Sequence, residues 1–137
     1  MLDHLGDGTF GRALKCAELT PSLNLPTGEH QLPAASIDTA DKPTWAVKVI
    51  RAVPRYAESA KFEAQILMDL HSKGGCAQGI VYLKETFTNK SRQSYGSVSN
   101  MCLVFEPLGK SLYDFIKDNG YKGFEIGQLR EIAIQAL

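Results

Sequence analysis

Three glycines near the start of the chain have the spacing of a phosphate-binding turn. Gly6, Gly8 and Gly11 form a G-x-G-x-x-G pattern within residues 5–13. Because glycine has no Cβ atom, backbone N–H groups in such a turn can approach a phosphate closely, and positive φ angles carry no steric cost. Two unrelated nucleotide-binding architectures use this motif, and a glycine-rich hairpin that binds nothing shows the same pattern. The glycines alone therefore leave phosphate binding open.

A lysine and a glutamate, each among apolar neighbours, add a second chemical feature. The alternation over 44–50 predicts a strand that places Lys48 beside β-branched residues. From Arg55 to about Ser72 the pattern predicts a helix, whose apolar face consists of Tyr56, Ala60, Glu63, Leu67 and Leu70. Because an unpaired charge is costly to bury, Lys48 and Glu63 are expected to pair. The alternative for Lys48 is an edge-strand lysine whose ammonium group reaches water.

Composition and charge limit the classes of protein to which this chain can belong. The 137 residues include 15 basic and 15 acidic side chains, which gives a formal net charge of zero. This balance argues against a nucleic-acid partner or a membrane-surface role driven by bulk charge. Three cysteines without metal-like spacing indicate a reduced, intracellular protein, either nuclear or cytoplasmic. No apolar run approaches the ~18 residues needed to span a bilayer, so no membrane partner is expected.

The remaining pattern predicts short strands separated by two long polar stretches. Strands are expected over residues 1–5, 12–19, 44–50, 80–87 and 101–105. Good helix formers within 12–19 leave open a Rossmann alternative, which needs a longer apolar strand before the glycines than residues 1–5 supply. Residues 20–43 are interpreted as a surface insertion. Thr88–Asn100 is interpreted as a polar linker, longer than a hairpin needs.

Two helices are predicted in the last part of the chain. Ser111 followed by Asp114 is close to a capping box, so a short helix should begin there and run to about Asp118. Apolar residues then trace one face of a second helix at Ile126, Leu129, Ile132, Ala133, Ala136 and Leu137. Because this pattern stops without a C-cap, we expect the chain to be truncated within a longer domain.

Together these motifs resemble the N-terminal lobe of a eukaryotic protein kinase. The glycines match the glycine-rich loop, Ala46-Val47-Lys48 matches the Ala-x-Lys of the third strand, and Glu63 matches the glutamate of helix C. Residues 105–109, Phe-Glu-Pro-Leu-Gly, lie where the gatekeeper and hinge belong. Within the kinases the chain is most similar to the LAMMER-type dual-specificity group. The segments that carry this similarity are Arg55-Tyr56-x-Glu58-x-Ala60-x-x-Glu63 and Phe105-Glu106-x-Leu108-Gly109-x-Ser111-x-Tyr113-Asp114-Phe115-Ile116.

The resemblance implies an α+β fold with a five-stranded antiparallel sheet and helix C. It divides the chain into an N-lobe over 1–105 that carries the insertion 20–43, a hinge over 106–110, and the start of an incomplete, truncated C-lobe over 111–137. The first helices of that C-lobe would be the two predicted after Ser111.

The resemblance also implies an ATP site. The backbone of Asp7–Phe10 would cover the phosphates, and Lys48 would hold the α- and β-phosphates, oriented by Glu63. Leu5, Ala13 and Ala46 would sandwich the adenine, whose edge the Glu106 carbonyl and the Leu108 N–H would read. Asp114 is placed to reach the ribose, and capping the helix is an equal alternative for it. The candidate catalytic residues are Lys48 and Glu63. The candidate nucleotide-binding residues are Leu5, Gly6, Asp7, Gly8, Thr9, Phe10, Gly11, Ala13, Ala46, Lys48, Phe105, Glu106, Leu108 and Asp114.

Two departures from the family pattern bear on activity. Ala13 stands where the family usually has valine, which removes roughly 1–1.5 kcal/mol of possible contact with the adenine. The sequence contains no His-Arg-Asp loop with its asparagine and no Asp-Phe-Gly. The catalytic base and both ligands of the Mg²⁺ that the family uses are therefore missing from this chain.

The expected function is the ATP-binding portion of a protein kinase, which transfers phosphate from ATP to protein Ser, Thr or Tyr hydroxyls. By family, the protein partners would be Ser/Arg-rich substrates, bound only if a C-lobe exists. One alternative is a non-catalytic, nucleotide-binding or regulatory module of the pseudokinase kind. A second is a truncated gene product without an independent function. We expect the 137 residues alone to be inactive as a kinase.

Overall fold

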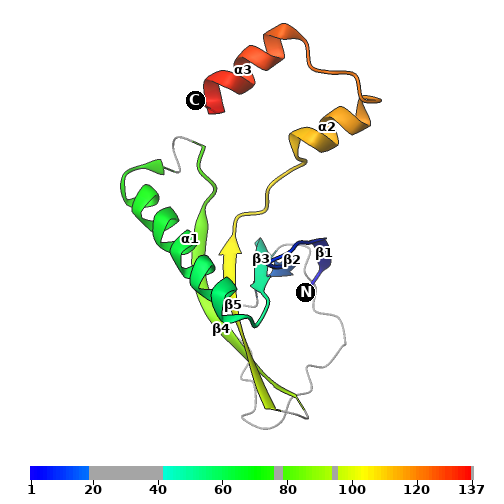
Figure 1. Cartoon of the computed structure of the whole chain (residues 1–137). Coiled ribbons are helices and arrows are strands. Elements are labelled where there is room, and N and C mark those ends of the chain that lie inside the picture. The colour runs from blue at the N-terminus through cyan, green and yellow to red at the C-terminus, as the bar shows by residue number, and fades with distance from the viewer. Residues whose placement is uncertain (19–41, 76–78, 94–95, 137) are drawn as a thin grey trace.

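The computed structural model describes residues 1–18, 42–75, 79–93 and 96–136 (Figure 1). Within these ranges the strands form one five-stranded antiparallel sheet in the order β1-β2-β3-β5-β4. Its strands are β1 (Asp3–Asp7), β2 (Gly11–Ala17), β3 (Thr44–Ile50), β4 (Leu83–Gln93) and β5 (Gly96–Phe105). Helix α1 (Pro54–Ser72) lies along one face of the sheet. The α+β fold and the five-stranded antiparallel sheet expected from the sequence are confirmed.

Alternation along β3 divides the core into two layers. Ile50 packs on the α1 side of the sheet with Leu103, Leu83 and two alanines of the helix. Val47 faces the opposite side, in a cluster with Cys102, Val104, Trp45, Val49 and Cys16. Because successive side chains of a strand point to opposite faces, this pattern is the one that the sequence over 44–50 predicts. Lys48 thereby falls on the side that α1 covers.

Helix α1 approaches the sheet through small residues. Pro54 occupies the first turn, where its missing N–H removes no helical hydrogen bond. Ala60 and Ala64 are buried against the sheet, and Tyr56 and Leu67 pack beside them. The prediction that Leu70 shares this face is wrong, because Leu70 is 36% exposed. At 3.6 residues per turn, Leu70 is rotated by about 80° from Ala60, whereas Ala64 lies only about 40° away.

The first two strands differ from their expected bounds by a few residues. β1 occupies Asp3–Asp7 and not 1–5, and β2 ends at Ala17 within the described residues. Since Gly11–Ala17 pairs with all of β3, the Rossmann alternative, in which a helix follows the glycines, is wrong. Most of the predicted insertion, residues 20–41, and Leu19 lie outside the described ranges.

The interpretation of Thr88–Asn100 as a linker is wrong. β4 and β5 continue as a paired ribbon through this stretch, with Thr88 opposite Met101 and Lys90 opposite Ser99. β3 pairs with β5 only over Cys102–Phe105, so the ribbon projects beyond the sheet (Figure 1). Among the described side chains, those of Thr88–Lys90 and Val98–Asn100 belong to neither core cluster, so this part of the ribbon needs no apolar alternation, and its polar sequence concealed the strands. β4 also begins at Leu83, three residues later than expected.

Two further helices follow the sheet at the end opposite the ribbon (Figure 1). Helix α2 (Leu112–Asp118) begins at Ser111 with the predicted capping box, and α3 (Ile126–Ala136) follows the expected apolar pattern. Neither helix buries a side chain among the residues described. In the same ranges, no helix is long and apolar enough to cross a membrane.

Replacement of Gly11 by alanine should destabilise the fold. A Cβ atom at this position would lie 2.2 Å from the Val49 carbonyl oxygen, because β2 and β3 approach closely there. Such overpacking typically costs about 1–3 kcal/mol. A Cβ atom at Gly6 would meet no atom within 4 Å, so Gly6→Ala is the matched control and should change stability by less than about 0.5 kcal/mol. Urea unfolding measures both variants, and equal losses would contradict this account of Gly11.

Candidate functional site

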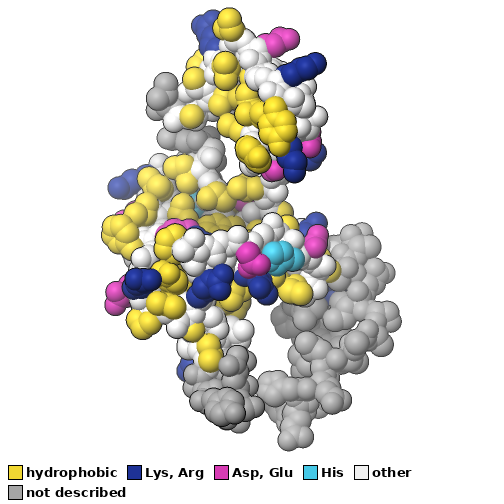
Figure 2. Space-filling view, turned by 45° about the vertical axis from the view of Figure 1, so that its right-hand side comes forward, with side chains coloured by type: hydrophobic (Ala, Val, Ile, Leu, Met, Phe, Trp, Pro, Cys, Tyr) yellow, Lys and Arg dark blue, Asp and Glu magenta, His cyan; other side chains and the backbone are white. Residues whose placement is uncertain are grey.

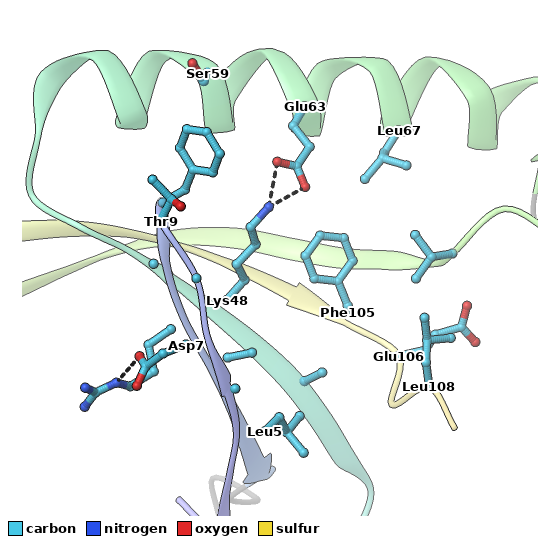
Figure 3. Close-up of a pocket in the computed structure, with 18 of the residues that line it drawn as sticks. Leu5, Asp7, Thr9, Lys48, Ser59, Glu63, Leu67, Phe105, Glu106 and Leu108 are labelled. Carbon is cyan, nitrogen blue, oxygen red and sulfur yellow. Dashed lines mark hydrogen bonds and ion pairs between the residues drawn. The ribbon is translucent and has the colours of Figure 1, made fainter. Parts of the chain in front are cut away.

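A cavity of about 990 Å³ lies between the glycine turn (Gly6–Gly11), β3, α1 and the segment that follows β5. In the space-filling view the hollow is walled largely by hydrophobic side chains (Figure 2), and the close-up shows the polar groups that enter it (Figure 3). The candidate residues that line it are Leu5, Gly6, Asp7, Gly8, Thr9, Phe10, Gly11, Ala13, Ala46, Lys48, Glu63, Phe105, Glu106 and Leu108. Asp114 is the one candidate named from the sequence that does not line the cavity.

An ion pair joins β3 to α1 inside this cavity. Lys48 Nζ donates to both carboxylate oxygens of Glu63 at 2.8 Å (Figure 3). The pairing expected from the sequence is present, and Lys48 is not a lone edge-strand lysine. The side chains of Lys48 and Glu63 are 33% and 41% exposed, so water screens the pair. A pair of this kind costs little desolvation and leaves the ammonium group accessible to a ligand.

The glycine turn is held from behind by the segment after β3. Gly8 N donates to Gly11 O at 2.9 Å, which closes the turn. Arg51 donates its backbone N–H to Phe10 O at 3.0 Å and its guanidinium to Gly8 O at 3.3 Å. Unlike the expectation from the sequence, the three glycines of the motif do not use positive φ angles. Gly11 has a steric role, because it fits against β3, whereas added Cβ atoms at Gly6 and Gly8 would meet open space or only distant backbone.

Asp7 contributes its backbone to the cavity, since its carboxylate is engaged across the hairpin. Arg12 Nε lies 2.9 Å from Asp7 Oδ1, and His4 Nε2 lies 3.3 Å from Asp7 Oδ2. The hydrogen bond from Arg12 lowers the pKa of the Asp7 carboxyl below its usual value. The carboxylate therefore stays ionised and paired at neutral pH.

Glu106 ties the segment after β5 to the start of β4. Tyr82 N donates to Glu106 Oε1 at 2.7 Å, and Glu106 N donates to Tyr82 O at 3.1 Å. These two bonds fix the side chain and the N–H of Glu106 on the side of Tyr82. Glu106 and Leu108 both line the cavity next to Phe105.

Asp114 lies outside the cavity lining and caps α2. Its Oδ2 accepts from Ser111 N at 3.0 Å and from Ser111 Oγ at 2.7 Å, while Asp114 N donates to Ser111 Oγ at 3.1 Å. The hydrogen bond from the Ser111 hydroxyl is the main reason that the pKa of the Asp114 carboxyl is lowered. Of the two roles considered for Asp114, the structure forms the capping contact.

Seven lining residues were not among the candidates. They are Arg12, Ser59, Phe62, Ile66, Leu67, Val81 and Gly109. Ser59 lies four residues before Glu63 on α1, so helical spacing around Glu63 could have found it. Within the ranges described, no group of three or more His, Cys, Asp or Glu side chains could hold a metal ion.

Comparisons with known proteins agree with this geometry. No family model matches the chain. Serine/threonine-protein kinase AFC2 of Arabidopsis thaliana is 34% identical over 135 residues, which cover 97% of this chain and 25% of that protein. Dual specificity protein kinase CLK1 of Mus musculus is 31% identical over 98% of this chain and 23% of its own length. Dual specificity protein kinase KNS1 of Saccharomyces cerevisiae is 35% identical over 98% of this chain and 15% of its own length.

A crystal structure of a kinase domain superposes with a TM-score of 0.67 and 34% sequence identity. The match covers 98% of this chain and 31% of that domain chain. The fold is therefore that of a protein-kinase N-lobe with the first helices that follow it. More specifically, the chain is homologous to the LAMMER-type dual-specificity kinases, as the sequence predicted, and it spans about a quarter or less of the length of these curated relatives.

The Lys48–Glu63 pair should show a coupling of about 1 kcal/mol or less in a double-mutant cycle, because both side chains are partly exposed. The cycle combines Lys48→Met with Glu63→Gln and measures the free energy of unfolding in urea. Lys48→Met combined with Glu58→Gln is the control and should be additive, since Glu58 is an exposed charge of the same helix. Strict additivity in both cycles would mean that the pair contributes nothing to stability.

Proposed function

We propose that this chain is the ATP-binding portion of a protein kinase. Residues 1–105 form the nucleotide-binding lobe, 106–110 the hinge, and 111–137 the start of the second lobe. The observation that carries this proposal is the bidentate contact of Lys48 with Glu63 at the wall of a cavity that the glycine turn borders. An ammonium group has three N–H donors. Glu63 can occupy two of them, and the third is free for a phosphate oxygen.

The cavity offers a surface for each part of ATP. The backbone of Asp7–Phe10 would cover the phosphates, and Lys48, oriented by Glu63, would hold the α- and β-phosphates. The lining residues Leu5, Ala13 and Ala46 provide an apolar slot for the adenine. The Glu106 carbonyl and the Leu108 N–H would read the adenine edge, since the side chain and N–H of Glu106 are engaged with Tyr82.

The residues present do not fit a magnesium site. Three of the lining residues are acidic, and the carboxylate of each already has a partner within the chain: Asp7 with Arg12, Glu63 with Lys48, and Glu106 with the Tyr82 N–H. Metal coordination or proton abstraction by any of them would compete with that contact. We derive no step through Mg²⁺ for this chain, and the kinase family's catalytic asparagine and aspartates have no counterpart in its sequence.

The reaction of the longer kinase would be phosphoryl transfer from ATP to protein Ser, Thr or Tyr hydroxyls, with Ser/Arg-rich proteins as its substrates, in the nucleus or cytoplasm. The similarity to Ser/Thr and dual-specificity kinases supports this class of reaction. A second candidate is a non-catalytic, nucleotide-binding or regulatory module of the pseudokinase kind. The contacts that the carboxylates of Asp7, Glu63 and Glu106 already make favour that role for the 137 residues alone.

Ala13→Val should tighten ATP binding by up to about tenfold, because the added methyl groups would restore apolar contact above the adenine. Ala13 lies opposite Lys48 in the β2–β3 register and lines the cavity. Ala17→Val, at the far end of the same strand and outside the lining, is the matched control and should leave the affinity unchanged. Calorimetric titration with ATP measures the three proteins. If none of them binds ATP, the proposed function fails.

The chain alone should transfer no phosphate, because it supplies neither a free carboxylate for the substrate hydroxyl nor ligands for the metal ions. The test is incubation with labelled ATP, Mg²⁺ and a generic basic protein, beside the Lys48→Met variant. Equal background labelling of the two proteins is the expected result. Labelling that depends on Lys48 would contradict this prediction and would show that the chain does supply a catalytic base.

A further inference from the structure

An aromatic contact joins the tip of the glycine turn to the first turn of α1. The rings of Phe10 and Tyr56 lie 5.2 Å apart between centroids at an interplanar angle of 79°, an edge-to-face arrangement. Aromatic pairs favour this geometry because the positive ring edge meets the negative ring face. Phe10 is 54% exposed and belongs to neither core cluster, whereas Tyr56 packs against the cluster beneath α1. The contact therefore attaches a surface turn to a side chain anchored in the core.

Arg51 of the β3–α1 connection and Arg55 of the first turn of α1 support this contact. The guanidinium of Arg55 lies 5.0 Å from the centroid of the Tyr56 ring, and its Nη2 donates to the Tyr56 hydroxyl at 3.3 Å. Arg51 holds the carbonyls of Gly8 and Phe10 from the same connection. The tip of the turn is thus bound by a short stretch of chain that leads directly into α1.

Tyr56 and Glu63 move together when α1 moves. They are seven residues apart, which is nearly two helical turns, so their side chains leave the helix in almost the same direction. A rotation of α1 that withdraws Glu63 from Lys48 would also withdraw Tyr56 from Phe10. The same rigid helix therefore links the position of the glycine turn to the Lys48–Glu63 pair.

We propose that Phe10 and Tyr56 form a latch that couples the glycine turn to α1, and that both are positioning residues for the ligand of the cavity. The coupling to nucleotide rests on the proposed function. With the latch closed, the turn stays over the cavity and Glu63 stays on Lys48. Because coupling between sites is reciprocal, a nucleotide that orders the turn also stabilises the first turns of α1.

Hydrogen exchange of the chain without nucleotide tests the latch itself. Phe10→Ala should speed amide exchange about three- to tenfold in the glycine turn and in residues 56–60, as expected for loss of one aromatic pair. Phe115→Ala removes an aromatic ring with the same 54% exposure from α2 and is the matched control, with unchanged exchange at both places. Tyr56→Phe keeps the ring and should behave as the wild type. Exchange in Phe10→Ala equal to that in Phe115→Ala would overturn the latch.

ATP titration of the same variants tests the coupling to the cavity. Phe10→Ala should weaken ATP binding about three- to tenfold. Its effect should be smaller when it is combined with Glu63→Gln, because the contact of Glu63 on α1 with Lys48 is then already lost. Unchanged affinity together with faster exchange in Phe10→Ala would overturn the coupling. If the wild type binds no ATP, the proposed function fails, and the exchange measurement without nucleotide still decides whether the latch exists.

Discussion

The contact between Lys48 Nζ and both oxygens of Glu63 at 2.8 Å depends on how closely α1 approaches the sheet. It can form because Ala60 and Ala64 are the residues buried beneath the helix, which lets the helix backbone approach the sheet. Larger side chains at these two positions would lift α1 and carry the carboxylate away from the ammonium group. The shape of the cavity, the accessible cation within it and the orientation of α1 therefore all depend on this packing.

Binding and chemistry make different demands on the same cavity. Holding an anionic, partly apolar ligand needs backbone groups, an apolar slot and one cation, and the lining residues provide each of these. Phosphoryl transfer also needs carboxylates that are free to take a proton or a metal ion. Asp7, Glu63 and Glu106 are held by partners within the chain. The contacts of these carboxylates are thus compatible with the binding role proposed above.

The sequence predicted best the elements that pack against a core. Residues 44–50 have a buried face on each side of the sheet and alternate clearly, so the bounds of β3 and its pairing of Lys48 with Glu63 were predictable. The β4–β5 ribbon was missed because it has no core to pack on and carries no apolar period. Asp114 was ambiguous because capping and ligand contact require the same carboxylate, and only the position of α2 distinguishes them. The lining by Phe62 and Ile66 depends on the rotation of α1, which the sequence alone does not fix.

The glycine turn shows how one motif takes its position from two independent constraints. At its C-terminal end, Gly11 fits against the Val49 carbonyl, so the turn leaves β2 at a fixed place above β3. At its tip, Phe10 lies on Tyr56 and the turn's carbonyls accept from Arg51. On the N-terminal side of Phe10, Gly6 and Gly8 leave open space beside the cavity. The glycine pattern therefore predicted a candidate phosphate-binding turn. The connection of this turn to the helix that carries Glu63 comes from Phe10, a side chain between the glycines.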